Sequence, residues 1–562
     1  MKNWVVQGQY DASVGVLPVL LRNRGVGVND QEEFLTPRPI AHYLNGLSGE
    51  FKAALKQARQ EILRAINQNS PIIIHGDYDA DGICATAILY KTLTQTLGYA
   101  KVAYFIPNRF DHGYGLSLES VTEMAKLVAA RFKVAEERSI PTPTSPALII
   151  TVDCGITAEP EVLARAHDQG FRLIITDHHQ KQEHLPQAEV VLWTDGVVGA
   201  GVALILSLVL GAKDEQLVSL AGIATVTDLA PLRGFNRALV TRALASLATN
   251  PPLGISSLLT ASGRTSSAIS TYDLGYIIGP RLNAAGRLES AYASLNLLLE
   301  EDSAVVLELA QKLTAVNTER QELTLHMLEL AGQLVNPEAA SVVVVASPDF
   351  HEGVIGLVAG KLAQKYYRPA IVISVTGDTA KGSARSVPGV NISDLLRHFE
   401  DRFTGLGGHP MAAGFSLHKD KLDQFMAEFV AYTQEVIPAE LLVPQLTVDL
   451  AIPLAVVTEQ FVQEVDQLRP YGVGNPEPLF VSRAVGVAGA NYVGKDGAHL
   501  SVKLFDGSTT YKSIMFDAKN LGVPALTWGS KIDLVYSASL KDYNGKTSVD
   551  LIIKDYAVSA QT

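Results

Sequence analysis

Side chains that can bind a cation or move a proton crowd the sequence just after position 74. His75, Asp77, Asp79 and Asp81 lie in one short segment, which reads HGDYDADG. Three carboxylates this close repel one another unless a divalent cation offsets their charge, and carboxylates with an imidazole suit Mg²⁺ or Mn²⁺. The segment therefore predicts a metal site, with an Asp-rich turn that caps a helix as the alternative interpretation.

Later segments carry the same kinds of side chain. Asp153 stands in TVDCGIT, His178 and His179 stand in TDHHQ, and Asp228 stands in TVTDLAP. We predict that these groups converge with the first segment on one site that holds two cations. The alternative is that each acts as an unrelated turn cap.

The spacing suggests how the ligands divide between two metal ions. We assign His75 and Asp79 to one ion, and Asp153 as the carboxylate that bridges both. Two cations held about 3.5–4 Å apart suit in-line displacement at phosphorus by an activated water. The second ion is assigned to Asp81, His178 and Asp228.

The catalytic residues are predicted to be Asp77, Asp153 and His179. Of these, His179 is expected to donate to a phosphoryl oxygen or to the leaving oxygen. The alternative for His179 is a supporting position outside the ligand set.

Apolar runs come directly before these polar loops, as buried parallel strands do. The alternation of strands and helices predicts a parallel sheet with helices on both faces, and open α/β sheets bind ligands at the carboxyl ends of their strands. Residues 136–146 are charged and rich in Pro and Thr, so we expect an exposed insertion. Strands are predicted over 71–74, 101–106, 147–152 and 171–176, and helices over 57–67, 83–93, 119–131, 201–210 and 218–227.

The rest of the chain predicts further domains. A long helix is expected over 302–335, followed by a second α/β unit with strands at 341–346 and 370–375 and a helix at 354–366. Short alternating runs after about residue 444 predict a small antiparallel barrel. The expected boundaries are a helical lead-in at 1–45, a catalytic domain at 46–300, a connecting helix at 301–337, a substrate-binding domain at 338–437 and the barrel at 438–562.

Composition bounds the class of protein. The chain has 562 residues, of which 47% are hydrophobic and 19% charged, a globular profile long enough for several domains. The net charge of −12 argues against a broadly basic surface but is compatible with a local basic groove. Cys84 and Cys154 cannot build a disulfide framework, so we expect buried thiols in a cytoplasmic protein. The start of the chain lacks a signal pattern, and the apolar run at 196–212 is interpreted as a core helix, so no membrane association is expected.

Several motifs resemble a known superfamily. HGDYDADG, NRFDHGYGLS, VDCGIT, TDHH and TDLAPL stand in the order of the DHH phosphoesterase superfamily. Segments 279–291, 352–374, 381–396, 405–417 and 471–480 resemble the RecJ family within it, and the resemblance runs from about residue 16 to beyond 550. One departure is Asp111 and His112 before Gly113, where the pattern leads us to expect an acidic residue directly before the glycine.

The resemblance implies a fold and an activity. The expected fold is α/β, with a parallel-sheet DHH domain joined by a long helix to a smaller α/β DHHA1 domain, plus a C-terminal OB-like β-barrel. The expected activity is that of a single-strand-specific 5′→3′ DNA exonuclease that releases 5′ mononucleotides by two-metal hydrolysis in DNA recombination and repair. It implies Mn²⁺ or Mg²⁺ as cofactors and single-stranded DNA, a single-strand-binding protein and a recombination helicase as partners of a monomeric enzyme.

Phosphate contacts are expected in the second α/β domain. Ser383, Arg385 and Ser386 combine hydroxyls with a guanidinium, which suits a terminal 5′ phosphate; the alternative is an ordinary polar loop. The resemblance implies that a glycine-rich motif also holds substrate phosphate, and the alternative there is a tight turn before a strand. Its residues are Gly407, Gly408 and His409.

Further DNA contacts are expected along the cleft. Tyr114 and Phe110 are candidates for stacking on a base, with a core position as the alternative. Contacts with backbone phosphates are expected from Arg109, Arg281, Arg287 and Arg320, and Asn283 is expected to bind the substrate as well.

Two other functions share some of these features. A DHH enzyme for small substrates, such as an oligonucleotide or cyclic-dinucleotide phosphodiesterase or a pyrophosphatase, has the metal motifs but generally lacks a C-terminal barrel of this kind. A non-catalytic scaffold would keep the fold, yet every expected metal ligand is present in this chain. The exonuclease is therefore the favoured prediction.

Overall fold

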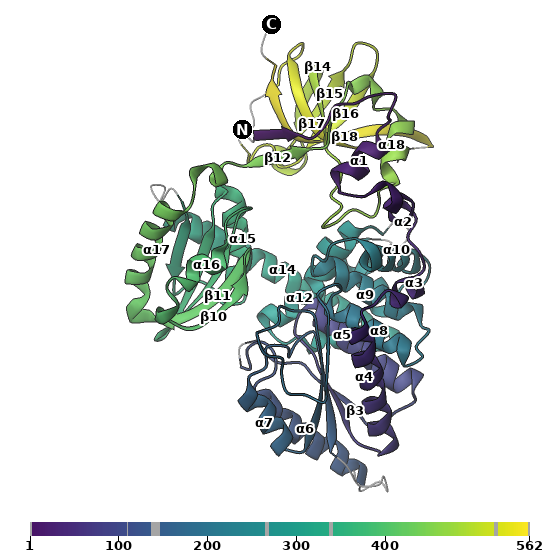
Figure 1. The fold of residues 1–562 in the computed structure, drawn as a ribbon. Helices are drawn as coiled ribbons and strands as arrows, with labels where there is room; N and C mark the ends of the chain where they lie inside the picture. The colour runs from purple at the N-terminus through teal and green to yellow at the C-terminus, as the bar shows by residue number, and fades with distance from the viewer. Residues whose placement is uncertain are drawn as a thin grey trace. The chain divides into compact units, whose positions relative to one another are not determined.

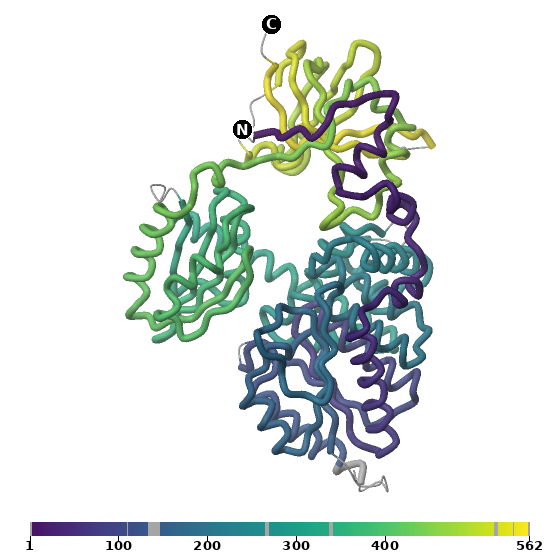
Figure 2. The backbone as a smooth tube through the Cα atoms, in the orientation of Figure 1, coloured from purple at the N-terminus to yellow at the C-terminus, as the bar shows by residue number. Residues whose placement is uncertain are grey.

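The computed structural model describes residues 3–109, 111–136, 146–264, 269–335, 341–521, 526–543 and 545–559. The chain forms two compact units, one made of residues Met1–Thr36 with Ile437–Thr562 and the other of Pro37–Val436 (Figures 1 and 2). The predicted insertion at 136–146 and the candidate Phe110 fall almost wholly outside the described residues. In the part of the chain that is described, no helix is both long and apolar enough to cross a membrane.

The metal-binding motifs follow a five-stranded sheet in the second unit. All its pairings are parallel, in the order β3-β2-β4-β5-β6, which confirms the predicted architecture. The strand β6 was not predicted, because it has only four residues and buries only every second one. The strands are β2 (Ile72–His75), β3 (Val102–Phe105), β4 (Ala147–Val152), β5 (Phe171–Asp177) and β6 (Val190–Trp193).

Helices cover both faces of this sheet, as predicted. Along β2, Ile72 and Ile74 pack into one hydrophobic core, whereas Ile73 packs into another on the opposite face. The first core takes its helical residues from α4 (Gly49–Asn67), α5 (Ala80–Lys91), α8 (Gly199–Val209) and α9 (Glu215–Thr227). The second takes them from α6 (Leu118–Glu136) and α7 (Pro160–Asp168).

A run of helices continues the same core. It comprises α10 (Gly234–Thr249), α11 (Leu253–Ala261), the π-helix η4 (Asp273–Ile278), α12 (Gly279–Leu288), α13 (Tyr292–Leu299) and α14 (Ser303–Leu334). The last of these confirms the predicted long helix; Asp302 caps it by accepting from two backbone amides, and its 32 residues span about 48 Å.

The second α/β sheet has the order β10-β11-β9-β8-β7. Only β7 and β8 pair in parallel, and the glycine-rich motif at 405–417 forms the antiparallel β10–β11 hairpin. Its elements are β7 (Val343–Ser347), α15 (Ile355–Tyr366), β8 (Ala370–Thr376), β9 (Thr379–Arg385), α16 (Ile392–Arg397), β10 (Phe403–His409), β11 (Ala412–His418) and α17 (Leu422–Val436).

The other unit is built around a closed barrel of β14, β15, β16, β18 and β17, in which β17 pairs back to β14. The expectation of a wholly antiparallel barrel is wrong at one pair, since β16 and β18 run parallel. The lead-in was expected to be helical, but it opens with the strand β1 (Asn3–Val6), paired with β12 (Gln445–Val448). The barrel strands are β14 (Phe480–Val493), β15 (His499–Phe505), β16 (Thr510–Met515), β17 (Lys531–Tyr543) and β18 (Lys546–Val558).

Helices from both ends of the chain complete this unit. Arg24 pairs with Asp449 at 2.8 Å and donates to Asn475, so a buried polar network ties the lead-in to the segment before the barrel. The helices are α1 (Leu17–Asn23), α2 (Gln31–Leu35) and α18 (Glu459–Asp466), while α3 (Ile40–Asn45) belongs to the other unit.

Candidate metal centre

The loops after β2, β4 and β5 and the end of α9 bring the predicted ligands together. Three sets of side chains each place their ligand atoms within 4.8 Å of one another. The sets are Asp81, His178 and Asp228; Asp77, Asp79 and Asp153; and Asp153, His178 and His179. The first set matches the ligands predicted for one ion, and Asp153 belongs to both other sets, as a bridging carboxylate would.

His178 lies at the middle of the cluster. Its Nε2 is 3.1 Å from Asp153 Oδ1 and 3.6 Å from both Asp81 Oδ2 and Asp228 Oδ2. Burial, followed by the neighbouring His179, lowers the pKa of His178 to about 4. A neutral imidazole with its lone pair directed at carboxylates is the form that binds a cation.

The start of α8 holds Asp81 in place. The two carboxylate oxygens of Asp81 accept hydrogen bonds of 2.7 Å from the backbone amides of Gly199 and Ala200. These amides are among the first of the helix, where unpaired N–H groups and the helix dipole favour an anion. Asp81 is therefore fixed before any cation binds.

Asp153 depends on a close approach by the same helix. Its backbone has a φ of 62°, a left-handed conformation that Asp and Asn adopt more readily than most residues. A Cβ placed on Gly199 would come within 2.5 Å of the Asp153 side chain. Only glycine at position 199 leaves room for this carboxylate.

Replacing Gly199 with alanine is expected to displace Asp153, although alanine is the better helix former. Overpacking of this kind costs about 1–3 kcal/mol of stability, and Mn²⁺ binding should weaken with it. Thermal unfolding and Mn²⁺ titration measure both effects. The matched control is Gly332→Ala near the end of α14, where an added Cβ meets nothing within 4 Å. Equal metal affinity in the two variants would show that Gly199 does not set the position of Asp153.

The loop after β2 supplies two further carboxylates. Asp79 caps α5 by accepting from the amides of Asp81 and Gly82, as the capping alternative anticipated, yet it also belongs to one of the ligand sets. Asp77 is buried, and its Oδ1 has no hydrogen-bond partner. The cap is therefore present, and the geometry is also compatible with the predicted metal site.

Several buried polar atoms of the site have no hydrogen-bond partner among the described residues, and a bound cation would give them a partner. Within the described ranges, the site atoms without a hydrogen bond are His75 Nε2, Asp77 Oδ1, Asp153 Oδ1 and His178 Nε2. Buried polar atoms are nearly always hydrogen-bonded, and oxygen and imidazole donors in this number suit Mg²⁺ or Mn²⁺. The residues present therefore fit a divalent-cation site.

The carboxylates of the site are held in unfavourable surroundings for negative charge. Burial, and then the charge of Asp79, raises the pKa of Asp81 to about 7 and the pKa of Asp77 well above its usual value. Burial and the charges of Asp81 and Asp79 raise the pKa of Asp228 to about 8, and the pKa of Asp153 is also raised well above its usual value. Bound cations would relieve this repulsion.

Mn²⁺ binding is expected to weaken as the pH falls from about 8.5 to about 6, because protons compete for Asp228 and Asp81 in this range. The metal-free protein should respond in the opposite direction. A carboxyl whose pKa is raised by folding destabilises the fold when charged, so stability should increase as the pH falls through 8 and 7. Calorimetric titration and thermal unfolding at each pH measure both trends, and a Mn²⁺ affinity that is constant over this range would contradict the expectation.

His75 is the one predicted metal ligand that lies outside the three ligand sets. It ends β2 and is fully buried. Its Nδ1 lies 3.4 Å from the thiol of Cys154, while its Nε2 is one of the atoms without a partner. Burial lowers the pKa of His75 to about 4, so the ring is neutral and able to bind a cation. Cys84 and Cys154 are both free and buried, as predicted.

His179 is positioned by Asp177, a carboxylate that the sequence indicated only as part of the TDHH motif. Asp177 Oδ1 accepts from the His179 ring at 2.8 Å and from the amides of His178 and His179, and Asp177 Oδ2 accepts from the amide of Ile156. Burial alone would lower the pKa of His179, but Asp177 outweighs it and raises the pKa to about 9. The imidazole is therefore protonated at neutral pH. Tyr114 Oη also lies 3.0 Å from His179 Nδ1, which places it at the site.

Four arginines lie near one another beside residues 75–81, the metal-binding loop. This arginine group consists of Arg109, Arg287, Arg320 and Arg385. Burial, and then the charges of Arg109, Arg320 and Arg385, lowers the pKa of Arg287 to about 10. The Nε atoms of Arg109 and Arg320 are buried and have no hydrogen-bond partner within the part of the chain that the structure describes. The guanidinium of Arg109 lies 4.4 Å from the ring centre of Tyr78, next to Asp77. Asp77 and Asp79 lie near these arginines, but they are also candidate metal ligands, so the gathered cations favour a polyanionic ligand.

The predicted 5′-phosphate residues differ in their freedom to bind. Arg385 Nη1 donates to Ser383 Oγ and to the carbonyl of Ala384, so these two side chains lie together at the end of β9. Ser386 Oγ instead donates to the carbonyl of Val390 at 2.6 Å, which stabilises the following turn. Gly356 at the start of α15 leaves room for Arg385 and Ser383, since a Cβ there would come 3.0 Å from each of these side chains.

The glycine-rich motif lies close to Arg385. Burial and then the charge of Arg385 lower the pKa of His409, whose Nδ1 accepts from the amide of Met411. Gly408 has a φ of 153°, and a Cβ there would come 2.5 Å from the carbonyl of Ala412. Gly407 has open space around it.

The two remaining predicted contacts lie on α12. Asn283 Oδ1 accepts from the amide of Ala80, the first residue of α5, and so ties α12 to the metal-binding loop. Arg281 donates to the carbonyl of Ile277 and to Thr314 of α14, which leaves part of its guanidinium for a ligand.

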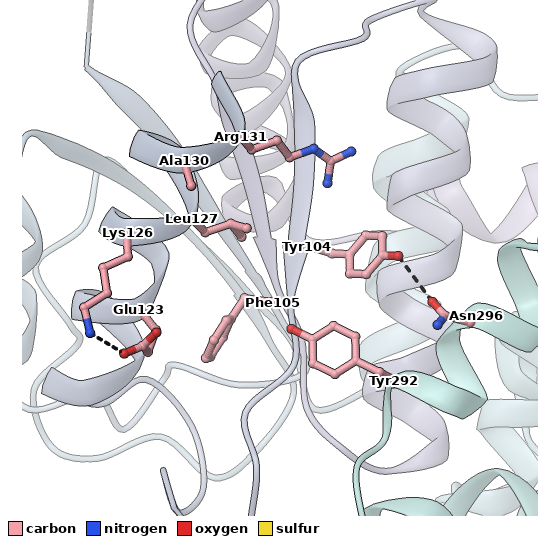
Figure 3. Close-up of a pocket in the computed structure, with 9 residues that line it drawn as sticks. All are labelled: Tyr104, Phe105, Glu123, Lys126, Leu127, Ala130, Arg131, Tyr292 and Asn296. Atoms are coloured by element: carbon pink, nitrogen blue, oxygen red, sulfur yellow. Dashed lines mark hydrogen bonds and ion pairs between the residues drawn. The ribbon is translucent and has the colours of Figure 1, made fainter. Parts of the chain in front are cut away.

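A pocket of about 520 Å³ lies beside the edge strand β3, and none of the predicted site residues lines it (Figure 3). Its lining residues are Tyr104, Phe105, Glu123, Lys126, Leu127, Ala130, Arg131, Tyr292 and Asn296. One lining residue lies next to a predicted metal ligand: the ring centre of Phe105 is 5.6 Å from the ring centre of His75.

Family models match three parts of the chain. They describe the DHH family, N-terminal domain, over residues 71–227, the DHHA1 domain over 339–435 and the RecJ OB domain over 448–555. These matches confirm the predicted fold class, including the OB-like barrel.

Curated proteins named single-stranded-DNA-specific exonuclease RecJ are similar to nearly the whole chain. The protein from Dickeya dadantii is 32% identical over an alignment of 585 positions that covers 96% of this chain and 96% of that relative. The protein from Bacillus subtilis is 33% identical over 520 residues, and the match covers 90% of this chain but 63% of that relative.

Solved structures agree with these relatives. The crystal structure of RecJ in complex with Mn²⁺ from Thermus thermophilus aligns with a TM-score of 0.81 and 29% identity, covering all of this chain and 80% of that one. The complex with Mg²⁺ from the same organism aligns with a TM-score of 0.74 and 27% identity, covering all of this chain and 79% of that one. Together with the near-complete match to the Dickeya relative, these likenesses confirm the predicted resemblance: the chain belongs to the RecJ family of the DHH superfamily.

Proposed function

We propose that this chain is a single-strand-specific 5′→3′ DNA exonuclease that releases 5′ mononucleotides by two-metal hydrolysis. Membership of the family gives the enzyme class, a metal-dependent nuclease, and the relatives' complexes with Mn²⁺ and Mg²⁺ support these cations as cofactors. The observation that carries the proposal is the convergence of carboxylates and imidazoles on one site, where four buried ligand atoms have no hydrogen-bond partner among the described residues.

The chain's own residues divide the work of the reaction. Asp81, His178 and Asp228 would hold one cation, and Asp77, Asp79 and Asp153 the other, with the unpartnered Nε2 of His75 as a further candidate ligand. When bound, such a pair of cations activates water and offsets charge on the phosphate. The ligand set thus differs from the predicted one by including Asp77.

His179 is suited to act as the general acid. Its imidazole is protonated at neutral pH because of Asp177, and it lies within the cluster. In the proposed reaction, water attacks the phosphorus between the first two nucleotides and the bond to the 3′ oxygen of the first nucleotide breaks. His179 would give its proton to that leaving oxygen.

In this proposal, the 5′→3′ direction of digestion comes from Arg385 and Ser383 of β9 together with the other arginines of the arginine group. A 5′ phosphate held by Arg385 and Ser383 would place the first internucleotide bond at the metals, so cleavage proceeds from that end. Arg109, Arg287 and Arg320 would bind the phosphates on either side of the bond. Binding should therefore weaken with salt despite the net charge of −12.

The test is digestion of 30-nucleotide DNA that is single- or double-stranded and labelled at either end, with Mn²⁺. The 5′ label should appear at once as a mononucleotide, the 3′-labelled strand should shorten through a ladder, and duplex should resist. First loss of the 3′ label, or equal digestion of duplex, would contradict the proposal. Activity confined to a dinucleotide would favour the small-substrate DHH enzymes instead.

The biological setting is part of the same proposal. A role in DNA recombination and repair, a cytoplasmic location, a monomeric state, and partnership with a single-strand-binding protein and a recombination helicase all remain predictions. The domain boundaries given above remain predictions too.

A further inference from the structure

Two tyrosines expose their rings on the helical segment that leads into α12. Tyr272 and Tyr276 are 54% and 68% exposed. Their ring centres lie 4.9 Å apart at an interplanar angle of 25°, so the rings stack on each other. Large aromatic side chains usually bury their faces, and a stacked pair left open to solvent is typical of a binding surface.

The backbone holds this pair firmly. Helical dihedral angles continue from Tyr272 through the π-helix η4 into α12, and π-helical turns occur frequently at functional sites. Leu274 and Ile278 of η4 are buried, which directs the tyrosines outward. The carboxylate of Asp273 accepts from the amide and hydroxyl of Ser270 and anchors the start of the segment.

The same helical segment packs directly against the metal centre. A Cβ on Gly279 would lie 2.3 Å from the side chain of Thr227, the residue before the ligand Asp228. Further along α12, Asn283 contacts the amide of Ala80 in the metal-binding loop. Arg287, about 12 Å beyond Gly279 along the helix, belongs to the arginine group.

This order along one helix gives a direction. The arginine group, which includes Arg385, lies at the Arg287 end, the metal ligands lie beside the middle, and the tyrosines lie past the Gly279 end. A strand whose 5′ phosphate is held by Arg385 would leave the metals toward the tyrosines. Arg281, between them, is available for a phosphate.

We propose that Tyr272 and Tyr276 form a stacking platform for unpaired bases of the substrate strand on the 3′ side of the scissile bond. This inference rests on the proposed function. Every base has a π-face, so stacking on tyrosine binds single strands without reading sequence. In a duplex the base faces are already covered, so the platform would also add to the preference for single strands.

Binding of DNA tests the platform without requiring catalysis. In the Asp153→Asn background, the double variant Tyr272→Ala/Tyr276→Ala should bind a 5′-phosphorylated 20-nucleotide oligothymidylate about 10- to 100-fold more weakly by fluorescence anisotropy. The matched variant Tyr272→Phe/Tyr276→Phe keeps the rings and should stay within about twofold of the tyrosine protein. Equal affinity of the alanine and phenylalanine variants would overturn the platform.

Abasic substrates give a second test with the tyrosines intact. Removing single bases in turn from the third to the seventh nucleotide should weaken binding at the positions that cover the rings. The same abasic sites should have no effect on the double alanine variant. An abasic penalty of equal size in both proteins, or none in either, would overturn the platform.

The active enzyme separates this inference from the proposed function. With native Asp153, the alanine pair should raise KM for the 20-nucleotide strand by a similar factor and leave kcat, and hydrolysis of a 5′-phosphorylated trinucleotide, unchanged. No Mn²⁺-dependent digestion by the native chain, with tyrosine-dependent binding intact, would count against the proposed function alone. Normal digestion with an unchanged KM would count against the platform alone.

Discussion

Replacing Asp153 with asparagine is expected to lower the rate of Mn²⁺-dependent DNA digestion by about 10³-fold or more. A carboxylate shared between two cations contributes several kcal/mol of transition-state stabilisation, and each 1.4 kcal/mol or so is a factor of ten in rate. Asparagine matches aspartate in size and tolerates the φ of 62° at this position, whereas alanine would add backbone strain. The loss can therefore be attributed to the missing charge.

The same change should stabilise the protein when metal is absent. The pKa of Asp153 is raised well above its usual value, chiefly by burial and then by Asp81, so its charged form destabilises the folded state at neutral pH. A neutral amide removes that cost, and the melting temperature in chelator should rise while the increase on adding Mn²⁺ shrinks. Asp168→Asn, at an exposed position in α7, is the control. A variant that keeps its activity, or that melts lower than the native chain in chelator, would contradict this reasoning.

Replacing Arg385 with alanine is expected to erase the preference for 5′-phosphorylated over 5′-hydroxyl ends. A guanidinium that forms charge-assisted hydrogen bonds with a phosphate contributes about 1.5–3 kcal/mol, so digestion of phosphorylated ends should fall about 10- to 100-fold. Digestion of 5′-hydroxyl ends should change little, because that substrate lacks the group that Arg385 binds. Competition between the two substrates in one reaction measures the preference directly.

Two further variants make the result specific to the guanidinium. Arg385→Lys keeps the charge but not the forked geometry, so it should retain only part of the preference. Arg397→Ala removes an exposed arginine that pairs with Asp394 on α16 and should leave the preference intact. A preference that survives in Arg385→Ala would show that another group recognises the 5′ end.

Local sequence patterns predicted most of the residues that the fold brings together at the candidate metal centre, because strand ends are local features. The apolar run at 71–74 followed by HGDYDADG was enough to predict β2, the loop and the start of α5, and the same held for Asp153 and His178. Parallel strands gather their carboxyl ends at one edge of a sheet, so convergence followed from the fold class.

Other features depend on contacts between distant segments, which spacing does not encode. The amides of α8 that bind Asp81 and the room that Gly199 leaves for Asp153 come from a helix more than 100 residues after the first motif. The role of Asp177 in orienting His179 could have been suspected from its place directly before the imidazoles. The buried position of His75 could not have been predicted, because the burial of a strand end depends on which distant segments cover it.

The second domain and the barrel show the same division. The glycine-rich motif was predicted as a phosphate site, but nothing local indicated a β-hairpin rather than a turn. In the barrel, alternating runs indicated strands, whereas the parallel pairing of β16 with β18 is a matter of topology. Tyr272 and Tyr276 carried no motif at all, and only their exposure in the folded chain revealed them.

Titration of the metal-free chain with Mn²⁺ by calorimetry, at neutral or mildly alkaline pH, is the most direct measurement of whether these scattered acids form one centre. We predict that two ions bind per chain, that Asp153→Asn reduces this number or the affinity, and that digestion of single-stranded DNA begins only as the sites fill. Binding of no ions, or two-ion binding that Asp153→Asn leaves unchanged, would contradict the central claim.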